Sequence, residues 1–194
     1  MKNLLEIRIH GRGGQGNVVA AYLLASVAID EGYYGQAFPS FGAERRGAPV
    51  VAFVRMSDVP VKRRCQVLHP SYLIVQDQAL LQVPGVLQGL SEHGRILVNS
   101  TRSSEALQQQ LGVEVLTLPA AQIAERFLGR PLPNTALVAA FLTLTGICSI
   151  KALNNALAER FAGKILEKNL SLVEEIPNQV PADQWKESIH VAHP

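Results

Sequence analysis

The residues best suited to chemistry in this sequence form a glycine-rich run, Gly11–Gly16 (GRGGQG), which satisfies the pattern G-x-G-x-x-G. Glycines let the backbone turn sharply and approach a ligand closely, and a helix that starts there offers free N–H groups to a phosphate. Leu4–His10 reads as a strand and Asn17–Glu31 as an apolar helix, which is the context this pattern requires. A tight strand-to-helix turn without any ligand would give the same pattern. The candidate binding residues of the loop are Gly13, Gly14, Gln15 and Gly16.

The sequence after the loop disfavours a dinucleotide. A site for NAD or FAD needs a second strand that ends in Asp or Glu about 20 residues further on, to hold the ribose. The corresponding region, Tyr33–Ser40, contains no acid, whereas Asp30 and Glu31 come too early and fall on the helix. The lysine of a P-loop is missing too, because Gly16 is followed by asparagine.

Two adjacent arginines provide a second candidate anion site. Arg45 and Arg46 lie in a loop that glycines flank, and guanidinium groups match the geometry of phosphate oxygens. An isolated pair of this kind can equally be a solvated charged turn.

Other kinds of site find little support. The two cysteines, Cys65 and Cys148, are too far apart and too few for a zinc site, an iron–sulfur cluster or a disulfide scaffold, and they suit a reduced, cytoplasmic protein. None of the five histidines has ligand or catalytic spacing, and no nucleophile elbow or paired carboxylate is visible. The net charge of +2 gives no argument for nucleic acid. We therefore expect no catalytic residue and no metal site.

The elements predicted from the pattern belong to one α/β domain, residues 1–176, with a mostly parallel sheet, flanking helices, a Rossmann-like opening and a helical C-terminal part. Strands are expected at 4–10, within 33–46, and at 47–57, 72–76, 95–99 and 113–118. Helices are expected at 17–31, 120–128, 134–145, 150–162 and 164–175. Residues 177–194 contain scattered prolines and polar residues, so we expect an extended tail that lies on a partner. We expect no signal peptide, because Lys2, Glu6 and Arg8 interrupt the apolar residues at the start, and the longest apolar stretches are too short to span a membrane.

Two segments together resemble the gamma subunits of pyruvate/2-oxoacid:ferredoxin oxidoreductases. The first is IRIHGRGGQGNVVAAYLLASVAIDEG, with the family's GxGGQG loop, and the second is FPSFGAERRGAPVVAFVRMSD. In the second segment Ala48 stands where the family has a further glycine, while Arg55 and Ser57 match the strand end. Pro133-Asn134-Thr135 before an apolar helix also fits. The resemblance covers most of residues 4–170.

The resemblance implies a complex that oxidatively decarboxylates a 2-oxoacid with coenzyme A to acyl-CoA and carbon dioxide. Thiamine diphosphate, Mg²⁺ and iron–sulfur clusters would lie on the alpha, beta and iron–sulfur partner subunits, and electrons would pass through them to ferredoxin or another acceptor. This chain would help to bind coenzyme A through Gly13–Gly16, Arg45 and Arg46, with Asn134 on the far wall. Two alternatives are a free-standing NAD(P)-binding oxidoreductase and a purely structural assembly subunit.

Overall fold

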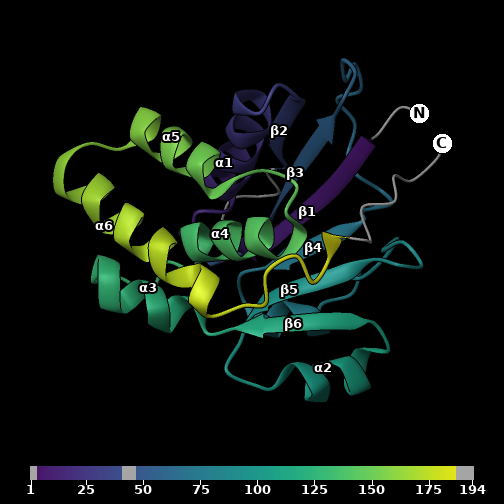
Figure 1. Ribbon diagram of the computed structural model, residues 1–194. Coiled ribbons are helices and arrows are strands. Elements are labelled where there is room, and N and C mark those ends of the chain that lie inside the picture. Colours follow the sequence, from purple (N-terminus) through teal and green to yellow (C-terminus); the bar gives the residue numbers. More distant parts are fainter. Residues whose placement is uncertain (1–3, 41–46, 187–194) are drawn as a thin grey trace.

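The computed structural model describes residues 4–40 and 47–186, which form a single six-stranded sheet with helices on its two faces (Figure 1). The strands lie in the order β2-β3-β1-β4-β5-β6. Their bounds are Leu4–Arg12 (β1), Tyr34–Ser40 (β2), Pro49–Ser57 (β3), Tyr72–Val75 (β4), Arg95–Asn99 (β5) and Glu114–Leu118 (β6). The helices are Asn17–Asp30 (α1), Ser104–Leu111 (α2), Ala120–Leu128 (α3), Asn134–Thr145 (α4), Ile150–Arg160 (α5) and Gly163–Glu175 (α6), with 3₁₀ turns at Gln78–Gln82 (η1) and Ile176–Asn178 (η2).

The predicted α/β fold is confirmed, and the sheet is mixed. The pairs β1–β4, β4–β5 and β5–β6 are parallel, whereas β3 runs antiparallel to both β1 and β2. The connection from β2 to β3 is too short for a crossover, so the chain must return beside itself as a hairpin. Pro49 is the first residue of the inner strand β3. Proline is tolerated at the first residue of a strand, although it cannot donate a backbone hydrogen bond to the ladder.

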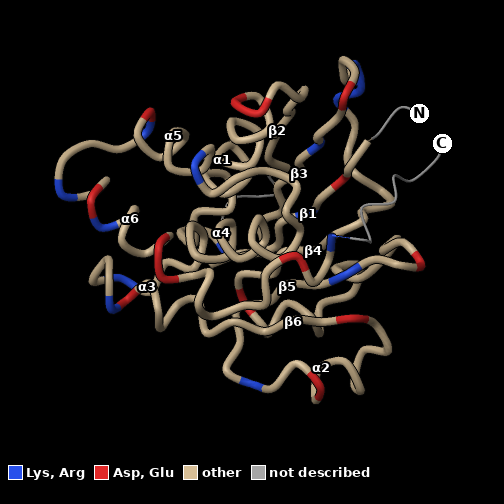
Figure 2. The backbone as a smooth tube through the Cα atoms, in the orientation of Figure 1, with Lys and Arg blue, Asp and Glu red and all other residues tan. Residues whose placement is uncertain are grey.

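The main core lies between one face of the sheet and the helices α1, α3, α4, α5 and α6. Every residue of α4 except Thr143 is buried, as expected for a helix that is apolar on all sides. In Figure 1 α4 lies directly in front of the sheet, with α5 and α6 outside it. Figure 2 shows no charged residue along α4, whereas Lys, Arg, Asp and Glu appear on the surrounding loops, helices and strands. Because α4 is packed on all sides, the position of its N-terminus against the sheet is fixed by the core.

A smaller core covers the opposite face of β4, β5 and β6, under α2 and η1. Neither α2 nor η1 was predicted from the sequence. The local signals for α2 are nevertheless present, since the side chain of Ser103 accepts a hydrogen bond from the Ala106 amide and Gly112 ends the helix in the left-handed conformation.

The prediction of a separate tail from Pro177 onward is wrong for residues 177–186. Trp185 is fully buried and its ring stacks on Tyr72, with the centroids 5.8 Å apart. Its indole N–H donates to Glu114 at 2.8 Å, and its backbone N–H donates to the Leu144 carbonyl at 2.8 Å. One tryptophan buries as much area as several smaller residues, so this segment docks without any periodic apolar pattern. Residues 187–194 lie outside the described part.

Across the described residues, none of the helices has both the length and the apolar character that crossing a bilayer requires.

Candidate functional site

The glycine loop joins β1 to α1 in a turn that its own residues hold together. The Gln15 amide donates to the Arg12 carbonyl at 3.1 Å, and the Arg12 amide donates to the Gln15 side-chain oxygen at 2.7 Å. Gly14 and Gly16 have φ values of 95° and 80°, which side chains other than glycine rarely adopt. A Cβ atom at Gly14 would meet nothing among the described residues within 4 Å, so the loop is open on that side.

Two helix N-termini meet at this loop. Helix α1 starts after Gly16 and α4 after Pro133; neither has a side-chain cap or an acidic residue in its first turn. They are in contact, because a Cβ atom built on Gly16 would lie 2.6 Å from the side-chain nitrogen (Nδ2) of Asn134. The first N–H groups of a helix have no partner within the helix, and they carry the positive end of its dipole. The meeting point of the two helices therefore favours an anion.

The next two strands end beside the loop and are tied to a third helix. The side chain of Asn99, at the end of β5, donates to the Gln76 carbonyl at 3.0 Å and accepts from the Ala121 amide of α3 at 3.0 Å. The Gln76 amide in turn donates to the His10 carbonyl at 2.7 Å. The carboxyl ends of β1, β4 and β5 thus form one continuous edge, where open α/β sheets bind their ligands.

The arginine pair, Arg45 and Arg46, falls outside the described residues. The two residues that follow it touch the glycine loop: the Gly13 amide donates to the Ala48 carbonyl at 3.1 Å, and Arg12 donates to the Gly47 carbonyl at 3.2 Å. The chain therefore comes out of the arginine segment directly against the glycine loop.

Sequence reasoning missed an ion pair at this edge, between Arg12 and Asp77. Asp77 also caps η1, because its other oxygen accepts from the Ala79 amide at 2.9 Å. Both residues were visible in the sequence as polar positions next to strand ends. Because parallel strands end at the same edge of a sheet, that placement was the signal that could have found them.

A cavity of about 340 Å³ opens beside the ion pair. The residues that line it come from the glycine loop, the ends of β4 and β5 and the start of α3, and they include Gln15, Gln76, Asp77, Gln78, Asn99 and Gln122. The Gln76 side chain is fully buried, and its amide nitrogen and oxygen have no hydrogen-bond partner within residues 4–40 and 47–186. Burying an unpaired polar group costs about 1–3 kcal/mol. No hydrogen bond within residues 4–40 and 47–186 offsets this cost for Gln76.

His10, the histidine nearest the loop, does not belong to the site. Its neighbour Ile9 faces the core under α1, so the His10 side chain points to the opposite face of the sheet. Burial, and then the positive charge of Arg8, lower the pKa of His10 to about 4. The imidazole is therefore neutral near pH 7.

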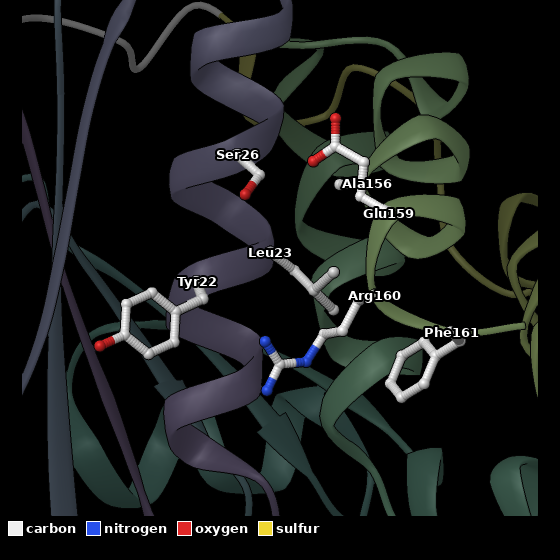
Figure 3. A pocket seen from close by; sticks show the side chains of 7 residues that line it. All are labelled: Tyr22, Leu23, Ser26, Ala156, Glu159, Arg160 and Phe161. Carbon is white, nitrogen blue, oxygen red and sulfur yellow. The ribbon is translucent and has the colours of Figure 1, made fainter.

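A second hollow, of about 570 Å³, lies between α1 and α5 on the outer side of the helical layer (Figure 3). Tyr22 and Leu23 from α1 and Arg160 from the end of α5 are among the residues that line it. None of the seven lining residues holds a buried polar atom without a partner. The cavity at the sheet edge differs in this respect, because it is lined by Gln76, whose buried polar atoms have no partner among the described residues.

The described residues offer no place for a metal or a cluster. They contain no group of three or more His, Cys, Asp and Glu side chains that could hold a metal ion. Cys65 is exposed and Cys148 buried, and neither forms a disulfide. Burial, with a smaller effect from the charge of Glu31, raises the pKa of the Cys148 thiol to about 12, so it is a packing residue and not a ligand.

The fold and the site define an α/β domain with an anion-friendly glycine loop and, within residues 4–40 and 47–186, no group of side chains that could hold a metal ion. The family described as pyruvate ferredoxin/flavodoxin oxidoreductase matches residues 6–176. The pyruvate synthase subunit PorC of Methanocaldococcus jannaschii is 45% identical over 177 residues, which cover 91% of this chain and 97% of that protein. The chain therefore belongs to the pyruvate ferredoxin/flavodoxin oxidoreductase family.

Solved structures agree. The PORC subunit of the Thermotoga maritima pyruvate oxidoreductase superposes with a TM-score of 0.82 at 33% identity, over 93% of this chain and 99% of that one. The 2-oxoglutarate:ferredoxin oxidoreductase of Magnetococcus marinus, solved with 2-oxoglutarate, coenzyme A and succinyl-CoA bound, shares the fold with a TM-score of 0.73 at 20% identity. The match covers this whole chain and 33% of that larger one.

Proposed function

We propose that this chain is the gamma-type subunit of a 2-oxoacid:acceptor oxidoreductase and that its glycine loop binds the phosphates of coenzyme A. The observation that carries the proposal is the contact between Gly16 and Asn134, which joins the uncapped N-termini of α1 and α4. Two helix dipoles then act on one anion, in a loop whose open side at Gly14 leaves room for a ligand.

Coenzyme A carries a diphosphate and a 3′-phosphate, so it needs two anion sites. The glycine loop supplies the first. We assign the second to Arg45 and Arg46, and the residue that follows them in the sequence, Gly47, accepts a hydrogen bond from Arg12 of the loop. Guanidinium groups there bind phosphate oxygens through charge-assisted hydrogen bonds. The role of this chain is to hold and orient coenzyme A, while the reacting centre belongs to other subunits.

The remaining cofactors are assigned to partners. The described residues lack the thiolate array that an iron–sulfur cluster needs and the carboxylate group that would hold Mg²⁺. We propose that alpha, beta and iron–sulfur subunits hold thiamine diphosphate, Mg²⁺ and the clusters, with ferredoxin or another acceptor taking the electrons. The naming of similar proteins as subunits of pyruvate synthase and pyruvate oxidoreductase supports a hetero-oligomer. We place that complex in the cytoplasm.

The two alternatives predict different binding. A free-standing NAD(P) enzyme is disfavoured because β2 ends in Pro39 and Ser40 and offers no acid for a ribose. Tight NAD binding by the purified chain would favour it. A purely structural subunit would leave coenzyme A kinetics unchanged when the loop is altered.

The test is Arg46→Ala in the assembled complex. Losing one charge-assisted hydrogen bond costs about 1.5–3 kcal/mol, so the KM for coenzyme A should rise roughly 10- to 150-fold while the KM for the 2-oxoacid stays constant. Arg64→Ala removes an exposed arginine of another loop and is the matched control. Unchanged coenzyme A dependence in both Arg45→Ala and Arg46→Ala would assign these arginines a structural or interface role. A shift in the 2-oxoacid KM would instead place the loop at the thiamine site.

A further inference from the structure

The connection between β3 and β4, residues 58–71, is long and irregular, yet one buried arginine holds it. Its fourteen residues form neither helix nor strand, and loops of this length within a compact domain usually serve a function. Arg55 of β3 is only 1% exposed and pairs with Glu6 at 2.6 Å. The same guanidinium donates to the backbone carbonyls of Arg63 at 3.4 Å and Gln66 at 3.3 Å. The backbone of this loop is therefore ordered before any partner arrives, which lowers the entropy cost of binding.

The loop concentrates the positive charge of the chain. Lys62, Arg63 and Arg64 are exposed, and their side chains form no ion pair or hydrogen bond with another residue in the described part of the chain. With Asp58 as its one acidic residue, the loop has a net charge of +2, which equals the net charge of the whole chain. The rest of the chain is therefore neutral overall.

The loop lies at the edge of the sheet that is opposite to the glycine loop. Before it, Ser57 of β3 pairs with Leu4, the first residue of β1, and after it the Ser71 amide donates to the Glu6 carbonyl at 2.8 Å. In Figure 2 blue segments mark the outer part of this loop, which extends beyond the end of β3. The glycine loop follows the other end of β1, roughly 27 Å away along the strand. The cations of the loop are thus too far away to act on a ligand there.

We propose that residues 58–71 dock this chain onto an acidic surface of a partner subunit. Cations that have no partner of their own attract carboxylates and speed the association of two proteins. An apolar side chain beside them, Leu68, is 65% exposed and gains by burial against a protein. Nucleic acid is a poorer fit, because the neutral remainder of the chain continues no basic surface beyond the loop. The inference rests on the proposed function, from which it takes the hetero-oligomer.

The first test reverses two of the three cations in the full-length chain of the complex. The loop variant is Lys62→Glu/Arg64→Glu, and the control, Lys164→Glu/Lys168→Glu, makes the same change of net charge at exposed positions of α6. The complex is captured through a tag on a partner subunit, and the retained chain is measured at rising NaCl concentration. We expect the loop variant to bind roughly 10- to 100-fold more weakly and the control to bind like wild type. Equal retention of the loop variant and wild type, or an equal loss in the control, overturns the proposal.

The second test needs no variant and therefore does not depend on how a variant folds. A carbodiimide joins a lysine amine directly to a carboxylate that touches it. In the wild-type complex Lys62 should form such a link to an Asp or Glu of a partner subunit, detected by mass spectrometry after digestion. Links within this chain only, or none, overturn the proposal. Binding to anionic vesicles or to DNA that the loop variant loses while it assembles normally would assign the loop to another ligand and overturn it as well.

Failure of docking and failure of the proposed function give different results. Because the loop lies far from the glycine loop, complexes that contain the loop variant should keep the KM for coenzyme A. For the same reason Arg64→Ala serves as the control for Arg46→Ala. If the loop variant assembles normally while Arg46→Ala raises the coenzyme A KM, docking fails and the proposed function stands. If the wild-type chain co-purifies with no other subunit, the proposed hetero-oligomer fails with it.

Discussion

The side chain of Asn134 occupies the space that a Cβ atom on Gly16 would enter. The ideal Cβ position lies 2.6 Å from the side-chain nitrogen of Asn134 and 2.9 Å from its side-chain carbonyl carbon. Glycine at position 16 therefore serves two needs at once, the left-handed backbone and the close approach of α4. The wall of the proposed anion site depends on this pair.

Gly16→Ala should therefore be costly in both stability and binding. The methyl group collides with Asn134, and alanine at a φ of 80° is strained by about 1–2 kcal/mol. We expect a lower free energy of unfolding and a raised KM for coenzyme A. The double variant Gly16→Ala/Asn134→Ala removes the collision and keeps the strain, so its loss of stability should be smaller than the sum of the two single losses. Simple additivity in denaturant unfolding would contradict the contact.

Trp185 should contribute strongly to stability although it lies beyond the last helix. Removing a large buried aromatic costs about 3–5 kcal/mol, and Trp185→Ala also leaves Glu114 without its indole donor. Trp185→Phe should cost less, because a ring still covers Tyr72. Circular dichroism in denaturant measures both changes. Truncation after Lys186 is the control and should keep the stability that truncation after Ile176 loses. Equal stability of the two truncated chains would show that the 177–186 segment contributes nothing.

His10 should make the domain less stable in mild acid. In the unfolded chain its pKa is about 6.5, while burial lowers the folded pKa to about 4. Above pH 6.5 both states are neutral and His10 contributes nothing. As the pH falls from 6.5 to 4, only the unfolded chain takes up the proton, so the free energy of unfolding drops by up to about 3 kcal/mol.

His10→Gln should remove this loss, giving a flatter pH dependence of the unfolding free energy between pH 7 and 4.5. His93→Gln removes an exposed histidine and is the matched control. Identical pH dependence in wild type and His10→Gln would show that the histidine is protonated in the folded state as well.

The isolated chain should carry no iron–sulfur chromophore. Two separate thiols, of which Cys148 is buried with a pKa raised to about 12, cannot provide the four thiolates of a cluster. The visible absorption spectrum of the chain, purified without partners under anaerobic conditions, checks this. A broad band that disappears on iron chelation would contradict it.

The sequence was most informative where local patterns settle structure. Five of the six strands follow from apolar or alternating runs, whereas β2 was expected only as a short strand within residues 33–46. The glycine loop follows from its place between a strand and a helix. The direction of β3 relative to its neighbours could not be read, because an alternating pattern is the same for parallel and antiparallel strands. Only the length of the connection between two strands indicates a hairpin. The C-terminal segment was misjudged for a related reason. Trp185 docks through long-range contacts with Tyr72 and Glu114, and such contacts leave no periodic pattern in the local sequence.

The binding edge was predictable in part. Gly16 and Asn134 were both named as site residues, and the structure brings them into contact across 118 positions of sequence. Gln76 and Asp77 were not named as site residues, although the sequence shows that they directly follow an apolar strand. What the sequence could not show is that the Gln76 carboxamide lacks a partner, because satisfaction of a buried group depends on every neighbour in space.

The late position of Trp185 also has a consequence for biosynthesis. Every strand and helix of the sheet domain precedes it, yet its ring covers Tyr72 and reaches across to Glu114 of the edge strand β6. A nascent chain can pair all six strands and still leave that aromatic surface open until residue 185 emerges. Translation that stops early would release a protein with a formed sheet and an exposed apolar surface around Tyr72, the kind of species that chaperones and proteases recognise.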